Sequence, residues 1–135
     1  MITKAQNKVF NTLLVEDSSA FRTVLNETLQ LHFPAIHIEE AEDGEKALQK
    51  INLLIPDLVF LDIKLPGENG IELTRHIKMR FNNIVIVILS SYDIPEYRQA
   101  AFRNGADCFI AKESLTCLDD VLARVEGTIA AKTLQ

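Results

Sequence analysis

Short apolar runs recur along this chain, and a segment with helical periodicity follows each of them. The runs cover residues 9–15, 36–38, 57–63, 84–89 and 107–111. Strands that are covered by helices on both faces have no polar side, so this alternation is typical of a parallel sheet. We therefore expect an α/β fold with a single doubly wound, five-stranded parallel sheet and right-handed crossovers.

The first helical segment is expected to begin at Ser18 and to end before Pro34. Its expected buried face carries Phe21, Val24, Leu25 and Leu29. Further helices are expected near residues 44–55, 71–81, 93–104 and 118–129. Five strands that alternate with five helices predict the flavodoxin-like (βα)5 topology, with strand order 2-1-3-4-5.

Length and composition favour one domain over residues 1–135. Hydrophobic residues make up 47% of the chain and charged residues 24%, which is the balance of a globular protein. The longest aliphatic run, residues 84–89, is far shorter than a membrane-spanning helix, and residues 1–8 lack the apolar stretch of a secretory signal. We expect a cytoplasmic protein with no membrane partner.

The net charge argues against direct nucleic-acid binding, and the cysteines indicate a role in the core only. A formal net charge of −5 makes this domain a poor binder of nucleic acid, because such binding depends on clustered Lys and Arg. Direct contact with DNA would require another domain. Cys108 and Cys117 lie in apolar surroundings without C-x-x-C spacing, so we expect them to be reduced and to fill the core.

Polar side chains stand at the ends of four of the five expected strands. Glu16 and Asp17 follow the first strand, Asp62 ends the third, and Ser90 and Lys112 follow the fourth and fifth. The carboxyl ends of parallel strands share one edge, and ligands bind there where the strand order reverses, between strands one and three. We therefore expect these five side chains to meet.

The combination favours a magnesium site that also accepts a phosphoryl group. Crowded carboxylates raise each other's pKa unless a hard cation lies among them, and Mg²⁺ prefers carboxylate and phosphate oxygens. Asp62 could act as a nucleophile, because carboxylates form aspartyl phosphates. Lys112 and Ser90 would then offset the charge of the transferring oxygens.

Four motifs, in order along the chain, resemble those of response-regulator receiver domains. They are Val15-Glu16-Asp17, Leu61-Asp62 with Pro66-Gly67 and Gly70, Leu89-Ser90, and Ala111-Lys112. The resemblance extends over roughly residues 8–128, and the stretch from Asp62 to Gly70 is its most diagnostic part. It implies a receiver, or phosphoacceptor, domain that acts as a phosphorylation-dependent switch in a two-component system.

The resemblance also implies the metal ligands and the acceptor. Asp62 would accept the phosphoryl group, and Mg²⁺ or Mn²⁺ would be bound by Asp17, by Asp62 and by the backbone carbonyl of Lys64. Glu16 would act on the metal through a water molecule. Catalysis would be limited to the domain's own phosphorylation and dephosphorylation, so the chain would not be an enzyme with an external substrate.

Lys112 and Ser90 are the phosphate-binding residues that the resemblance implies. Ser90 would turn towards the phosphate when Asp62 is modified, and Phe109 occupies the aromatic switch position. The output surface would include the helix near residues 93–104, the strand at 107–111 and the closing helix. A histidine kinase or histidine phosphotransfer protein would be the donor. A downstream protein or an attached effector domain, which could regulate transcription, would read the surface, and a phosphorylation-dependent homodimer is compatible with this scheme.

Two residues depart from the family pattern. Glu113 replaces the proline that commonly follows the lysine and brings a cis peptide bond. Without proline a cis bond costs about 2.5–4 kcal/mol, so this departure leaves open whether Lys112–Glu113 is cis or trans, and with it the exact reach of Lys112. Phe109 lacks the hydroxyl of the frequent tyrosine, so its inward movement would depend on packing alone.

Other interpretations of these residues remain open. Glu16 and Asp17 taken alone could serve only the helix N-terminus, an isolated Asp62 would usually be a turn residue, and Phe109 could equally be core. A haloacid-dehalogenase-type phosphatase would need a D-x-D motif, which residues 62–64 lack, and no glycine-rich nucleotide loop is present. An interaction module that never accepts phosphate is the stronger rival, and it would not need all of the polar groups that follow the strands.

Overall fold

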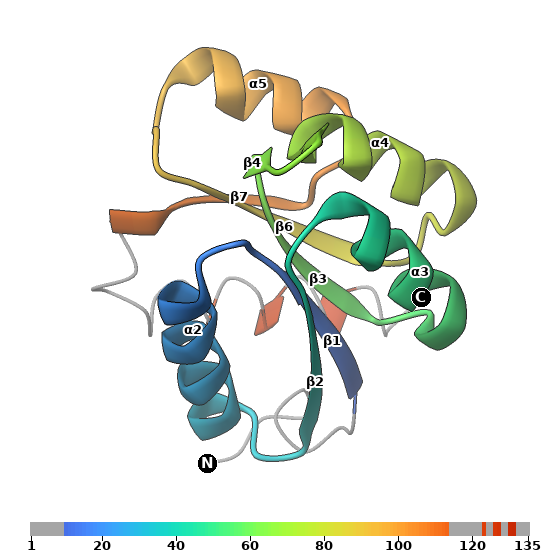
Figure 1. Ribbon diagram of the computed structural model, residues 1–135, viewed down its shortest axis with the longest axis vertical. Helices are drawn as coiled ribbons and strands as arrows, with labels where there is room; N and C mark the ends of the chain where they lie inside the picture. The colour runs from blue at the N-terminus through green and yellow to red at the C-terminus, as the bar shows by residue number, and fades with distance from the viewer. Residues whose placement is uncertain (1–9, 114–122, 124–125, 128–129, 132–135) are drawn as a thin grey trace.

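The structure is a computed structural model that describes residues 10–113, 123, 126–127 and 130–131 (Figure 1). The closing helix expected near residues 118–129 falls largely outside the described residues, and so does Cys117. Among the described residues, every helix is too short or too polar to cross a bilayer.

The central sheet has five parallel strands in the predicted order. They are β1 (Phe10–Val15), β2 (Ile36–Ala41), β3 (Leu58–Asp62), β6 (Val85–Ser90) and β7 (Cys108–Ala111). Across the sheet they are arranged β2-β1-β3-β6-β7, which is the order 2-1-3-4-5 in terms of the five predicted strands. The flavodoxin-like α/β prediction is therefore confirmed, and the strand order reverses between β1 and β3.

Four helices are seen in the described part of the chain. They are α2 (Ser19–His32), α3 (Gly44–Leu54), α4 (Gly70–Arg80) and α5 (Pro95–Arg103). Polar side chains cap three of them. Ser18 Oγ accepts a hydrogen bond from Phe21 N at 3.3 Å, Asp43 Oδ1 from Lys46 N at 2.8 Å, and Asn69 Oδ1 from Ile71 N at 2.7 Å. These caps fix where each helix begins after its strand.

A small hairpin between β3 and α4 was not predicted. Its two-residue strands, β4 (Lys64–Leu65) and β5 (Glu68–Asn69), pair antiparallel. The turn between them contains Pro66 and Gly67, and Gly67 adopts a φ of 79°, which favours glycine. The predicted turn is thus present, and the hairpin extends it beside the end of β3.

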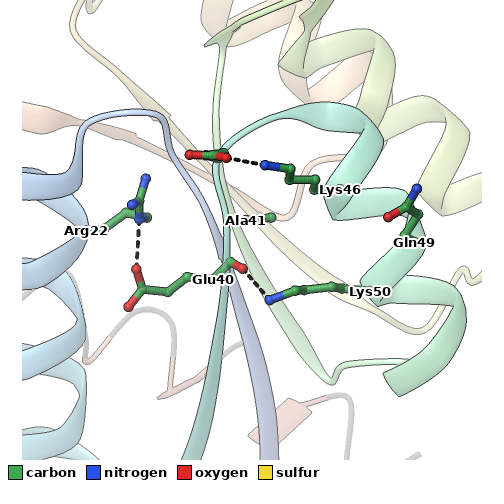
Figure 2. A pocket seen from close by; sticks show the side chains of 7 residues that line it. Arg22, Glu40, Ala41, Lys46, Gln49 and Lys50 are labelled. Carbon is green, nitrogen blue, oxygen red and sulfur yellow. Dashed lines mark hydrogen bonds and ion pairs between the residues drawn. The ribbon is translucent and has the colours of Figure 1, made fainter.

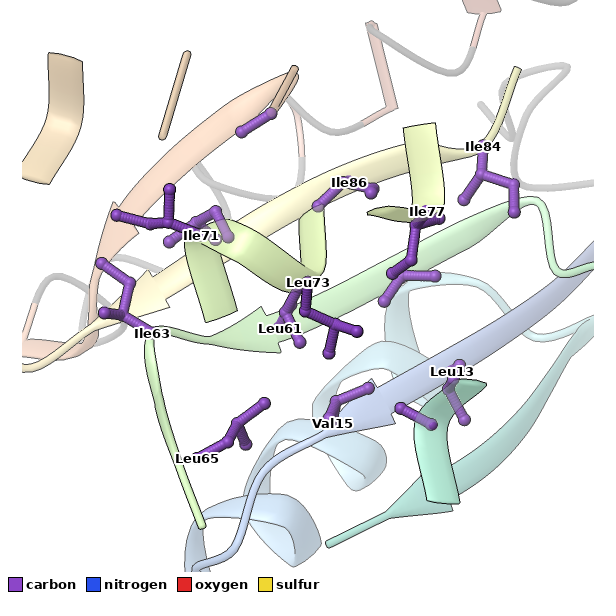
Figure 3. Close-up of a cluster of buried hydrophobic side chains, with 14 of the residues drawn as sticks. Leu13, Val15, Leu61, Ile63, Leu65, Ile71, Leu73, Ile77, Ile84 and Ile86 are labelled. Carbon is purple, nitrogen blue, oxygen red and sulfur yellow. The ribbon is translucent and has the colours of Figure 1, made fainter. Parts of the chain in front are cut away.

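The helices cover both faces of the sheet, so β3, β6 and β7 are buried on both sides, whereas β2, at the edge, is mostly half-buried. Alternate residues of β1 show the two cores: Leu13 and Val15 face α3 and α4, whereas Leu14 faces α2. Figure 3 shows the first of these clusters, with side chains from α4 packed over the strands. The second cluster includes Leu25, Leu29, Phe33, Phe60, Val87 and Cys108.

One residue of the predicted buried face of α2 was assigned wrongly. Val24 is 61% exposed, whereas Leu25 and Leu29 are buried and Phe21 is half-buried. At about 100° per residue, Val24 lies on the opposite side of Phe21 from Leu25. Phe33, which follows the helix and was not predicted as core, is fully buried. Cys108 is buried in β7, as predicted.

Strand register brings the polar strand ends together. Val15 pairs with Leu61, Asp62 with Leu89, and Ser90 with Ala111. Because the strands run parallel, the residues at these ends lie along one edge of the sheet.

Candidate functional site

Three carboxylates meet at the carboxyl edge of β1 and β3. Oxygen atoms of Glu16, Asp17 and Asp62 all lie within 4.8 Å of one another. Glu16 and Asp62 are only 1% and 6% exposed, whereas Asp17 is open to solvent. Two buried acids beside an exposed one form a set of hard oxygen donors that suits Mg²⁺ or Mn²⁺ and is reachable from water. The predicted acidic cluster is therefore present.

Lys112 joins this cluster from the end of β7. Its Nζ donates to Asp62 Oδ2 at 3.1 Å and also to Glu16 Oε1. The same ammonium lies 4.6 Å from the centroid of the Phe21 ring, a cation–π contact that the sequence did not predict. No cis peptide bond occurs in the described residues, so the Lys112–Glu113 bond, which the sequence left open, is trans. The trans loop thus still brings the amine to Asp62.

Burial and mutual contact shift the protonation of this cluster. The pKa of Glu16 is raised from 4.5 to about 7, mainly by burial; the hydrogen bond from Lys112 opposes the rise and the neighbouring Asp62 adds to it. Burial lowers the pKa of Lys112, but the hydrogen bonds and charges of Glu16 and Asp62 outweigh it, so the net pKa is raised. The raised pKa means that the positive charge near Glu16 is too weak to stabilise its ionised form fully.

The backbone around Asp62 fixes the direction of its carboxylate. Lys64 N donates to Asp62 Oδ1 at 3.2 Å, so one oxygen accepts from an amide and the other from the Lys112 amine. Gly70 N donates to Ile63 O at 2.7 Å, which holds the start of α4 against this loop. A Cβ atom on Gly70 would lie 2.1 Å from Asp62 O, so the close approach requires glycine.

Ser90 lies near Asp62, but its hydroxyl is directed to another residue. Ser90 Oγ donates to Tyr92 O at 2.8 Å and accepts from Tyr92 N at 3.0 Å. A small cavity of about 30 Å³ lies between the two strand ends. It is lined by Asp62, Ile63, Lys64, Ser90, Ser91, Tyr92 and Tyr97. The Ser90 hydroxyl is therefore close to Asp62 without being bonded to it.

Phe109 is buried in the first core cluster, on the face of the sheet that α3 and α4 cover. Its ring is 1% exposed and is covered by Arg98, whose guanidinium carbon lies 4.8 Å from the ring centroid. Arg98 also pairs with Asp93 at 2.7 Å, at the start of the segment that leads into α5. The aromatic position is thus inward in this structure, where it packs as a core residue.

Two residues of the site, Arg22 and Lys64, make contacts that could not be read from motifs. Arg22 donates to the backbone oxygen of Glu16 and pairs with Glu40 at 2.8 Å, so it ties the acidic loop to β2. The Lys64 ammonium lies 4.3 Å from the centroid of the Tyr92 ring. Arg22 and Lys64 belong to segments that the sequence placed next to the site, but their partners are distant in the chain.

A larger cavity, of about 460 Å³, lies beside the end of β2 (Figure 2). It is lined by Arg22, Glu40, Ala41, Glu42, Lys46, Gln49 and Lys50, none of which is a predicted site residue. Four of its charged groups form two ion pairs: Arg22 pairs with Glu40, and Lys46 pairs with Glu42. The third cation of the lining, Lys50, donates to the backbone oxygen of Glu40 at 2.6 Å. Arg22 links this cavity to the acidic loop.

The fold and the site together define a flavodoxin-like α/β protein with an acidic pocket, a hydroxyl and an amine at its switch point. Residues 12–126 match the family model of the response regulator receiver domain. The chain belongs to the response regulator receiver domain family.

Individual proteins agree with this assignment. A protein-glutamate methylesterase/protein-glutamine glutaminase 2 from Koribacter versatilis is 37% identical, over 89% of this chain and 35% of its own length. A two-component response regulator of the LuxR family from Aurantimonas sp. SI85-9A1 gives a TM-score of 0.83 at 26% identity, over 92% of this chain and 87% of that chain. The Mn(2+)-bound form of response regulator Rcp1 gives 0.72 at 25% identity, over 87% and 90%. The chain spans 35% to 51% of the length of the curated relatives it matches.

Proposed function

We propose that this chain is a phosphorylation-dependent signalling switch that accepts a phosphoryl group on Asp62. The observation that carries the proposal is the position of Asp62. Its Oδ2 accepts a hydrogen bond from the Lys112 ammonium at 3.1 Å, and Glu16 and Asp17 complete a set of oxygen donors around it. A carboxylate held in this way is a nucleophile whose product charge is offset in advance.

The donor in this proposal is a histidine kinase or a histidine phosphotransfer protein. The P–N bond of its phosphohistidine breaks while a P–O bond forms to Asp62. The imidazole keeps the electron pair of the broken bond and takes up a proton from water. Lys112 stays charged throughout and contacts a phosphate oxygen, and it holds no proton that must move. Its raised pKa supports this role.

The acidic cluster is the proposed metal site. Asp17, Asp62 and the backbone carbonyl of Lys64 would be direct ligands of Mg²⁺ or Mn²⁺, and Glu16 would contribute through water. The bound ion would offset negative charge on the transferring phosphate oxygens. The donors fit this ion in two respects: all of the side-chain groups are carboxylates, and Glu16 is an acid whose burial raises its pKa to about 7.

The switch in this proposal is a change of partner by Ser90. Its hydroxyl, now shared with the backbone of Tyr92, would turn to a phosphate oxygen on Asp62 and release the segment that leads into α5. Phe109, packed under Arg98, would respond to that movement from β7. The output surface would then comprise α5, β7 and the closing helix, and the added charge would bias two conformations that both exist beforehand.

We further propose that the whole domain, residues 1–135, works in the cytoplasm without a membrane partner. A downstream protein or an attached effector domain, which could be transcriptional, would read the surface, and phosphorylation could also drive a homodimer. The domain itself would not bind nucleic acid, in keeping with its net charge of −5. It would act on no external substrate.

Intact-mass measurement tests the central proposal. After incubation with Mg²⁺ and acetyl phosphate, the wild-type chain should gain one phosphoryl group, and Asp62→Asn should gain none. Asp93→Asn, which changes an exposed aspartate that pairs with Arg98, should be labelled like the wild type. Equal labelling of Asp62→Asn would show that the acceptor is another residue, and no labelling of the wild type would contradict the proposed function.

A further inference from the structure

The ammonium of Lys112 lies between two carboxylates and one aromatic ring. It donates to Glu16 Oε1 and, at 3.1 Å, to Asp62 Oδ2, and it lies over the Phe21 ring, 4.6 Å from the ring centroid. The Lys112 side chain is 18% exposed, so this ring contact is partly shielded from water. A cation over an aromatic face is attracted by the negative potential of that face, and the attraction strengthens as water is excluded.

The first turn of α2 holds the Phe21 ring in this place. Ser18 Oγ accepts a hydrogen bond from Phe21 N at 3.3 Å, and Ser18 N donates to Glu16 Oε2 at 3.2 Å. The ring is half-buried and packs against the second core cluster, which limits its freedom to turn away. This turn therefore sets the positions of two of the groups that contact Lys112, the Phe21 ring and the Glu16 carboxylate.

Lys112 needs such support because its own side chain is flexible. A lysine ammonium stands at the end of a four-carbon stem with several rotatable bonds. The two carboxylates that contact it would also change partners in the proposed reaction, since Glu16 would act on the metal through water and Asp62 would take the phosphoryl group. A phenyl ring binds neither the ion nor the phosphoryl group. The contact between Phe21 and the ammonium can therefore persist while both carboxylates change partners.

We propose that Phe21 is a positioning residue that holds the Lys112 ammonium beside Asp62, through a cation–π contact, while Asp62 reacts. This inference rests on the proposed function of Asp62 and adds a residue that acts on the reaction only through Lys112. Phe21 itself contacts neither the phosphoryl group nor the metal in this scheme. Its contribution is electrostatic, so it depends on the negative face of the ring and not on the volume that the ring fills.

Fluorination of the Phe21 ring separates the electrostatic contribution from the volume. Each fluorine that replaces a ring hydrogen withdraws charge from the aromatic face and changes the size of the ring little. Mono-, di- and trifluorophenylalanine, incorporated at position 21 alone, should therefore slow the labelling of Asp62 by acetyl phosphate and Mg²⁺ in steps. We expect a decrease of about fivefold for the trifluorinated ring, as for loss of a partly exposed cation–π contact. Equal rates along the series would overturn the proposal.

Phe81 is the matched control for fluorination. Its half-buried ring also has a cation–π contact, with the Arg80 guanidinium carbon 5.6 Å from the ring centroid. It precedes β6 at the amino edge of the sheet, whereas Asp62 lies at the carboxyl edge. Trifluorophenylalanine at position 81 should keep the wild-type labelling rate. A decrease equal to that at position 21 would mean that fluorination acts on the whole fold, and the role assigned to Phe21 would fall.

A double-mutant cycle shows whether Phe21 acts through Lys112. Phe21→Leu removes the aromatic face but keeps an apolar side chain, so it should slow labelling about fivefold. In the Lys112→Met background no ammonium remains for the ring, so the same change should have no further effect on the slower rate. A fivefold decrease in both backgrounds would mean that Phe21 acts on the fold or on the acidic loop, and that result would overturn the proposal.

NMR measures the contact without a metal or a phosphodonor. The Cε protons of Lys112 are one carbon from the ammonium nitrogen that lies over the ring, so the ring current should move their signals upfield. Phe21→Leu should return them to the positions of an ordinary lysine. Ordinary positions in the wild type would overturn the contact, whatever the labelling rates. If the shift is present but the wild type is not labelled, the proposed function fails. If the wild type is labelled on Asp62 and fluorination has no effect, only the role of Phe21 is wrong.

Discussion

The Ser90 hydroxyl is bonded to Tyr92 and not to Asp62, although all three residues line the same cavity. The hydroxyl donates one hydrogen bond and accepts another, and both are made with the backbone of Tyr92. A phosphate on Asp62 would therefore compete with the Tyr92 backbone for the hydroxyl, and the outcome would decide the position of the loop that leads into α5.

Replacing Ser90 tests this competition. In Ser90→Ala the loop loses its two hydrogen bonds, so labelling of Asp62 should still occur while the response of α5 and β7 is lost. The measurement is the change in amide NMR shifts on addition of Mg²⁺ and beryllium fluoride, read at Ala101, Phe102 and Ile110. Ser90→Thr keeps the hydroxyl and should retain the response. A full response of Ser90→Ala would mean that the signal reaches α5 by another route.

Lys112 is the residue whose loss should most reduce the labelling rate. Its ammonium contacts both Glu16 and Asp62, so Lys112→Met removes the positive charge that would meet the phosphate. Loss of one such group typically costs about 100-fold or more in rate. We expect a decrease of this order in labelling by acetyl phosphate at saturating Mg²⁺.

Lys46→Met is the matched control for Lys112→Met. It removes a surface lysine that pairs with the exposed Glu42, so its labelling rate should equal that of the wild type. A decrease of less than about threefold for Lys112→Met, measured beside this control, would show that the amine does not act on the phosphate.

The sheet and the strand-end groups could be predicted because both depend on local pattern. Apolar runs define the strands, parallel topology brings their ends to one edge, and Glu16, Asp62 and Lys112 meet there as expected. The cation–π pairs of Phe21 with Lys112 and of Tyr92 with Lys64 could not be predicted. Such pairs depend on rotamers of residues that are distant in the chain, and local periodicity carries no information about them.

The stability of the metal-free chain should depend on pH through Glu16. Its pKa is about 7 in the folded chain against 4.5 for an ordinary glutamate. The folded state therefore keeps this proton to higher pH than the unfolded state, so the contribution favours folding below pH 4.5 and is lost as the pH rises to about 7. The loss could reach about 3 kcal/mol.

Urea unfolding in EDTA measures this effect. Between pH 5 and pH 8, roughly the range over which Glu16 ionises, Glu16→Gln should gain stability relative to the wild type, because glutamine cannot ionise. Glu42→Gln, at an exposed position, should follow the wild type at every pH. A difference between Glu16→Gln and wild type that does not change with pH would mean that Glu16 titrates normally.

Addition of Mg²⁺ should reverse the penalty that Glu16 imposes above neutral pH. An ion that binds only the folded chain raises the midpoint of thermal unfolding in a concentration-dependent way. We expect this rise for the wild type near pH 8, a smaller rise near pH 5, where Glu16 is protonated, and little or none for Asp17→Asn. The same rise in Asp17→Asn would indicate that Mg²⁺ binds elsewhere.

Gly70 links the stability of the fold to the geometry of Asp62. A methyl group at this position would lie 2.1 Å from Asp62 O and 2.8 Å from the Ile63 Cα, both of which are backbone atoms that cannot rotate away. Gly70→Ala must therefore move α4 away from the loop or displace Asp62 itself. We expect a loss of about 3 kcal/mol in unfolding free energy, at the upper end of the range for overpacked sites, together with slower labelling of the part that still folds. Gly127→Ala is the control: nothing lies within 4 Å of a Cβ there, so the alanine should be neutral or slightly stabilising. A Gly70→Ala variant that matches this control in stability and labelling would show that the start of α4 does not hold Asp62 in place.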